Sequence, residues 1–192
     1  MISNRMENMR STLMSIQKEF ADDFQRTAAA SREEVMKVLK PGEAAPDTGK
    51  IWGKDARAEF ETRAAGYRSK ASAVIDATAA AIRADMTKAP STEAVAVINA
   101  LAARSSVSPE EIDAVLSKYG DNYLAYNAIR DIALSCGCRG VEEHHNTGDL
   151  REVQLSKSIV VGMTLTGAEK GYSANPAFLA FQNFMCGDDA EG

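Results

Sequence analysis

The spacing of apolar residues near the N-terminus predicts a long amphipathic helix over residues 1–39. Apolar side chains recur in steps of three and four, which places them on one helix face. They are Met9, Leu13, Ile16, Phe20 and Phe24. Ser31 and Glu34 form a capping-box pattern, so we expect the helix to restart or kink there before Pro41 and Gly42 end it. The short heptad run favours a core-facing helix over a coiled-coil arm that joins copies of the chain.

Residues 40–53 are predicted to form a linker, because they contain two prolines and three glycines. Trp52, the only tryptophan, lies near its end. A single tryptophan usually packs on neighbouring helices, since its large apolar area is costly to leave in water. The alternative is an exposed contact for a partner protein.

Residues 54–89 predict a second long helix, rich in alanine and interrupted by no proline. Its apolar stripe again follows helical spacing. The stripe comprises Phe60, Ala64, Tyr67, Ala71, Ile75, Ala79, Ile82 and Met86. This helix can pair with the first one as an antiparallel hairpin or with the same helix of another copy, and the sequence leaves both open.

Residues 91–137 predict a module of three short helices with clear start and stop signals. Pro90 ends the preceding helix, and Ser91 or Thr92 caps the first helix of the module. The third begins at Asp121 or Asn122 and ends at Gly137.

The second helix of this module carries the strongest signal in the chain. Ser108 is its predicted N-cap, Pro109 takes the first helical position and Glu111 completes a capping box. Val107 and Ile112 have the spacing of a hydrophobic staple. The helix closes at Gly120.

The C-terminal part, residues 138–192, is predicted to start with a loop over 138–149. The next segment admits a helix that aligns Leu155, Ile159 and Met163, or a strand over 155–166 with period-two alternation. We favour the helix, because a single strand has no visible pairing partner in this chain. A short helix is expected between Pro176 and Gly187.

The predicted fold class is therefore all-α. Two long amphipathic helices precede a bundle of short capped helices, with a single strand near 155–166 as the alternative. The segments run as an N-terminal helix (1–39), a linker (40–53), a second helix (54–89), the three-helix module (91–137) and a C-terminal loop with helices (138–192).

Charge and cysteine content narrow the class of partner and the compartment. The net charge is −5 with acidic and basic residues interspersed, which argues against a dedicated nucleic-acid surface. The sequence shows no signal-peptide pattern and no stretch of ~20 apolar residues that would cross a membrane. Its three cysteines leave one unpaired in any disulfide scheme. We expect a soluble protein in a reducing compartment, binding proteins and no membrane.

Five residues of metal-binding type lie towards the C-terminus: Cys136, Cys138, His144, His145 and Cys186. Their spacing does not fit a structural zinc site, because paired zinc cysteines usually have two to four residues between them and a single glycine intervenes here. A nucleophilic cysteine beside a histidine lacks a third, orienting group. Packing cysteines and solvent-facing histidines are the favoured interpretation.

No other pattern indicates catalysis or a cofactor. Adjacent glutamates such as Glu110 and Glu111 do not point at a common substrate atom, and helix-start charges explain them better. Neither a GxxxxGK[ST] nor a GxGxxG element occurs. We therefore predict a protein that is not an enzyme and binds no cofactor.

Tyr119, Tyr123 and Tyr126 gather at the turn between the last two helices of the module. This helix pair resembles a helix-turn-helix, but its second helix offers few basic side chains to a DNA groove, which argues against nucleic acid as a partner. The tyrosines and Trp52 are the candidate protein-binding residues, although amphipathic core tyrosines would look the same.

The segment 88–137 resembles uncharacterised helical proteins encoded near the capsid genes of tailed bacteriophages. The resemblance rests on a proline-led helix ending near Arg104, the S-P-E-E-I restart and the Y-G-D-N-Y-L-A turn, over about a quarter of the chain. It implies a capsid-associated, scaffolding-like or head accessory protein that oligomerises and binds capsid or head-tail proteins in the virion or host cytoplasm. The alternative is a bacterial cytoplasmic adaptor or regulator that binds a protein or nucleic acid.

Overall fold

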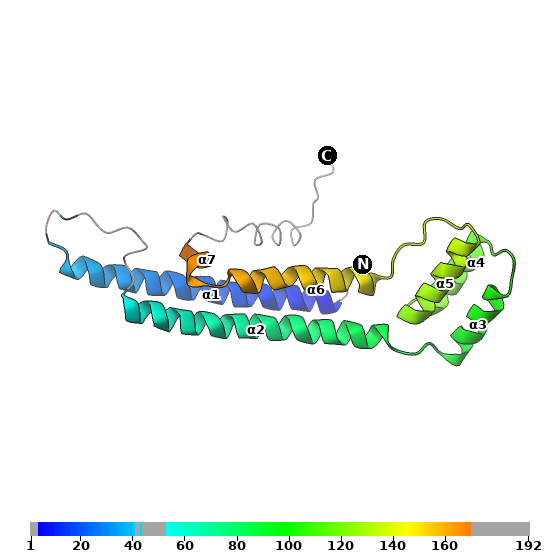
Figure 1. Ribbon diagram of the computed structural model, residues 1–192, viewed down its shortest axis with the longest axis horizontal. Helices are drawn as coiled ribbons and strands as arrows, with labels where there is room; N and C mark the ends of the chain where they lie inside the picture. The colour runs from blue at the N-terminus through cyan, green and yellow to red at the C-terminus, as the bar shows by residue number, and fades with distance from the viewer. Residues whose placement is uncertain (1–3, 41–42, 44–52, 170–192) are drawn as a thin grey trace. The chain divides into compact units, whose positions relative to one another are not determined.

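The computed structural model describes residues 4–40, 43 and 53–169. These residues form an all-α fold without any strand, which confirms the predicted fold class. Seven helices follow one another along the described chain (Figure 1). They are α1 (Asn4–Val38), α2 (Lys54–Met86), α3 (Thr92–Ala102), α4 (Pro109–Tyr119), α5 (Tyr123–Ser135), α6 (His145–Gly162) and α7 (Leu165–Glu169). The predictions for Trp52 and for a helix after Pro176 lie outside the described residues.

The chain divides into two compact units. The first comprises residues 1–78 and 153–192, and the second comprises residues 79–152. Because α2 and α6 cross these boundaries, each of them contributes residues to both units.

In the first unit, α1 and α2 pair as an antiparallel hairpin (Figure 1). The Phe20 ring lies 5.6 Å from the Phe60 ring and 5.7 Å from the Tyr67 ring, between ring centroids. Nearer the start of α1, Met9 lines a shallow depression together with Val74 of α2, so residue numbers rise on one helix as they fall on the other. The structure thus adopts the pairing within one chain that the sequence left open.

The seam of α1 follows the predicted three-and-four spacing. Its buried residues are Met6, Met9, Leu13, Ile16, Phe20 and Asp23. The predicted restart near Ser31 is wrong, because α1 runs without interruption to Val38. Ser31 is buried inside this helix and Glu34 is exposed. With no glycine or proline between Asn4 and Val38, nothing in the local sequence forces a break.

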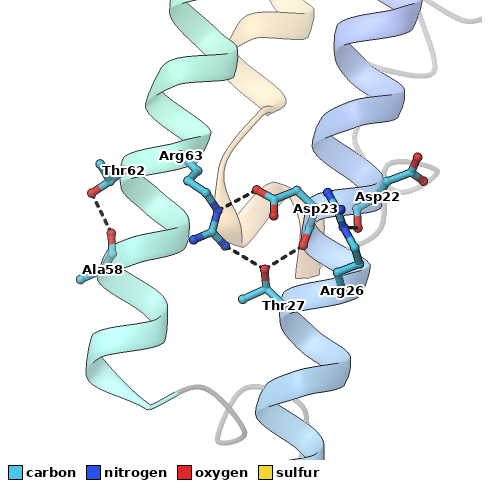
Figure 2. Close-up of polar contacts among 7 residues, drawn as sticks. All are labelled: Asp22, Asp23, Arg26, Thr27, Ala58, Thr62 and Arg63. Carbon is cyan, nitrogen blue, oxygen red and sulfur yellow. Dashed lines mark hydrogen bonds and ion pairs between the residues drawn. The ribbon is translucent and has the colours of Figure 1, made fainter.

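A polar network joins α1 to α2 within the seam (Figure 2). Asp23 is 8% exposed at a position where the spacing would place an apolar residue. Arg63 donates from Nε to Asp23 Oδ2 over 2.9 Å and from Nη2 to Thr27 Oγ1 over 2.8 Å, while Thr27 Oγ1 donates to the Asp23 carbonyl. Since these bonds form only when the three residues lie level, the network favours one register of the hairpin.

Residues 155–162 are helical, so the strand alternative is wrong. The predicted loop over 138–149 is also too long, because α6 already begins at His145. The buried face differs from the expected one: Val153, Ser156, Ile159 and Met163 are buried, whereas Leu155 is 51% exposed. The alignment through Leu155 failed because a second three-and-four series, beginning at Val153, occupies the buried side of the helix.

The turn after α6 is held by α2. Arg68 Nη1 donates to the Met163 carbonyl over 2.7 Å, and Glu61 Oε1 accepts the Leu165 backbone N–H over 3.0 Å. Because Leu165 is the first residue of α7, Glu61 supplies an acceptor for a backbone donor that has no partner inside that helix.

In the second unit, α3, α4 and α5 form the predicted module with the predicted caps. Ser91 Oγ accepts from Ala94 N, and Asn122 Oδ1 accepts from Ala125 N. The capping box of α4 is complete, with Ser108 and Glu111 each accepting the other's backbone N–H. The module core is made of Leu101, Val107, Ile112, Ile129 and Ala133.

Candidate protein-interaction site

His144 lies at the centre of the candidate site, between the α4–α5 turn and the start of α6. Its side chain is 2% exposed. The Asn146 backbone N–H donates to His144 Nδ1 over 3.1 Å, and the Thr147 N–H donates to the His144 carbonyl. His144 therefore acts as the N-cap of α6, a role usually taken by shorter polar side chains.

The other ring nitrogen of His144 reaches the α4–α5 turn. His144 Nε2 lies 3.1 Å from the Gly120 carbonyl oxygen. Because Nδ1 accepts from Asn146, the ring hydrogen is assigned to Nε2, which donates to Gly120. A neutral imidazole thus satisfies both contacts, and one side chain links the end of α4 to the beginning of α6.

Two of the predicted tyrosines pack on this imidazole. The ring centroids of Tyr123 and Tyr126 lie 5.3 Å and 5.0 Å from that of His144, both nearly perpendicular to it. Edge-to-face geometry of this kind is favourable beyond the apolar area it buries. The Tyr126 hydroxyl also donates to the Glu142 carbonyl over 3.0 Å, and Arg130 Nε donates to the Val141 carbonyl, so α5 holds the segment before α6 in place.

Burial lowers the pKa of His144 below its ordinary value of 6.5, and the neighbouring His145 adds to this effect. The contact with Gly120 and the charges of Asp121 and Asp149 act in the opposite direction. The neutral form is therefore favoured in the folded protein, which matches the acceptor role of Nδ1.

Tyr119 makes a separate contact between α3 and α4. Its hydroxyl and the Lys118 ammonium both donate to Glu93 Oε1, over 2.9 Å and 2.7 Å. These bonds lower the pKa of Glu93 and raise the pKa of Lys118, with the hydrogen bond between Glu93 and Lys118 as the largest cause in each case. The Lys118 ammonium also lies 5.1 Å from the Tyr119 ring centroid.

The structure thus brings Tyr123 and Tyr126 together at His144 and places Tyr119 at Glu93. All three tyrosines are half-buried. More exposed apolar side chains of this unit are Val95, Leu124 and Leu134, at 42%, 43% and 48% exposure. Sequence reasoning did not propose these three residues as protein-binding candidates.

The expectation of solvent-facing histidines is wrong for His144, which is buried because it caps α6, whereas His145 is exposed as expected. Cys136 and Cys138 pack against the module core, and Cys138 Sγ donates to the Val107 carbonyl over 3.7 Å. Among the residues that the structure describes, no three histidine, cysteine, aspartate or glutamate side chains come together in a group that could hold a metal ion. Cys186 lies outside the described residues.

Comparison with known proteins gives no family assignment: no protein-family model, no curated protein and no solved structure matches this chain. Within the described part of the chain, no helix combines the length and apolar character needed to cross a membrane.

Proposed function

We propose that this chain is a non-enzymatic structural or assembly protein of a tailed bacteriophage, acting through helix-mediated contacts with capsid or head-tail proteins and with copies of itself. The observation that carries the proposal is the pairing of α1, 35 residues long, with residues 54–78 of α2 into one hairpin within the first unit. At 1.5 Å per residue α1 is about 50 Å long. A hairpin of this length exposes extended helix faces to partner proteins.

α1 exposes apolar side chains suited to such contacts. Met14, Met36 and Val38 are 57%, 53% and 79% exposed. Burying a side chain of this size against a partner contributes up to ~1.5–3 kcal/mol, and methionine adapts its shape to irregular surfaces. In the first unit, Leu155 and Val161 of α6 are exposed as well.

Light scattering of the purified full chain, alone and mixed with the capsid protein of the source phage, tests the proposal. We expect an oligomer, or co-migration with capsid protein and recovery in proheads or virions. A strict monomer that is missing from both particles would overturn the proposal. Binding to DNA that weakens steeply with salt would favour the cytoplasmic regulator instead.

Paired variants locate the contact on α1. Met14→Glu places a charge on an exposed apolar position, and Ser15→Glu places the same charge on the next exposed position of the same helix. If the apolar surface of α1 mediates association, Met14→Glu should weaken the association and Ser15→Glu should leave the association unchanged. Equal effects of the two variants would assign the change to charge alone.

A further inference from the structure

The second unit contains an open depression with a volume of about 550 Å³ where three helices begin. Ser91, the N-cap of α3, and Asn122, the N-cap of α5, both line it. His145 and Asn146, the first two residues of α6, line it as well. The Asn122 side chain also donates to the Lys88 carbonyl over 2.9 Å, which holds the α2–α3 connection beside the α4–α5 turn.

Three helix N-termini contribute a positive backbone potential to this depression, which the last turns of α2 and α4, also in its lining, oppose in part. Each helix start carries partial positive charge and backbone N–H groups that lack a partner inside the helix. The charged side chains around it balance one another in number, since Lys88, Lys118, Asp85 and Asp121 all line it. The Lys118 ammonium is additionally bonded to Glu93. An anion here would therefore be held by the backbone of the three helix starts and not by a surplus of positive side chains.

Asn146 provides an independent indication of a ligand. This residue is 5% exposed and lines the depression. Its backbone N–H donates to His144, but its side-chain amide has no hydrogen-bond partner among the residues that the structure describes. Buried polar side chains are almost always hydrogen-bonded, so an unpaired amide here indicates a group that the depression receives.

We propose that the depression is a binding site for a small oxyanion, with the Asn146 side-chain amide donating to an anion oxygen. An oxyanion matches both observations, because its oxygens accept from the amide and its charge is stabilised by the helix termini. Asp85 and Asp121 weaken the positive potential, so the site is suited to moderate affinity. The proposal is independent of the assembly function, since it concerns residues of the second unit alone.

The test is a titration of the full chain, followed by amide chemical shifts in nuclear magnetic resonance, with sodium phosphate in one arm and sodium acetate in the other. Sodium chloride at matched ionic strength is the reference. We expect saturable shifts at residues lining the depression in at least one arm. A response to phosphate alone would assign a phosphate-like ligand, and a response to acetate would assign a carboxylate. Shifts that do not saturate, or that chloride reproduces, would overturn the proposal.

Variants with matched charge changes separate the site from general electrostatics. Asn146→Asp replaces the donor with a carboxylate and should weaken binding at least about tenfold. Asn127→Asp makes the same change on α5, where the native amide is already bonded to the Tyr123 carbonyl, and should change binding little. Equal losses in the two variants would refute a specific role of Asn146.

Two further variants check folding and the sign of the charge. Asp near a helix start is favourable, so Asn146→Asp should fold, and Asn146→Ala removes the amide without adding charge. Both should weaken binding. Asp121→Asn removes a carboxylate that repels the anion and should tighten anion binding. Weaker anion binding by Asp121→Asn would contradict the proposed polarity of the site.

Discussion

Replacing His144 with alanine removes the cap of α6, the bond to Gly120 and the two tyrosine contacts together. Loss of an N-cap costs about 1 kcal/mol. The Gly120 carbonyl loses its partner at a half-buried position, which adds about 1 kcal/mol because water can reach it in part. The packing of Tyr123 and Tyr126 on the imidazole adds a further ~1 kcal/mol. We therefore expect His144→Ala to lower the free energy of unfolding by about 3 kcal/mol.

Urea and thermal unfolding of the full chain, followed by far-ultraviolet circular dichroism, measure this loss. For a chain of this size it corresponds to a fall in Tm of roughly 6–12 °C. His144→Asn keeps a good N-cap and should recover about 1 kcal/mol of the loss. The matched control is His145→Ala, because His145 is exposed and its ring lies 4.1 Å from that of His144.

A loss in His144→Ala no larger than that in His145→Ala would refute the stabilising role of His144, since the buried imidazole would then contribute no more than its exposed neighbour. If His144→Asn loses as much stability as His144→Ala, capping of α6 by His144 contributes nothing measurable to the free energy of unfolding. That outcome would leave Gly120 and the tyrosines as the sources of stability.

Three further predictions concern stability. Because the pKa of His144 in the folded protein lies below 6.5, the stability that His144 contributes should be full above about pH 6.5 and lost as pH falls through this folded pKa. Urea unfolding midpoints over a pH series should show this loss in the native chain but not in His144→Asn. Asp23→Ala leaves Arg63 without its carboxylate and should lower the free energy of unfolding in urea by about 1–2 kcal/mol. Asp23→Leu fills the space between α1 and α2 and should restore most of this loss. Equal losses in the two variants would contradict the role given to the Asp23–Arg63 network. Ser108→Ala should lower the free energy of unfolding by about 1 kcal/mol, whereas Glu111→Gln, which keeps the reciprocal bond to the Ser108 N–H, should lower it by only about a few tenths of a kcal/mol. The reverse order in thermal unfolding would exclude the capping box as the main source of stability at the start of α4.

Part of the candidate site could be predicted from sequence and part could not. The three tyrosines were identifiable because they recur at a turn between two capped helices. Their partners were not, because Glu93 lies 26 residues before Tyr119 and Gly120 lies 24 residues before His144. A histidine in a polar segment carries no local signal that it caps a helix and bonds to a distant turn.

The sequence by itself determined the elements whose signals are local. Helix starts such as Ser108 and Asn122 depend on bonds to residues three positions away, and the α1 seam depends on a repeat of three and four residues. Only the tertiary structure decided how these elements pair. Packing buried Val153 and left Leu155 exposed, and it placed Asp23 opposite Arg63, 40 residues away. These outcomes depend on which surfaces meet, a property of the folded chain that local spacing does not encode.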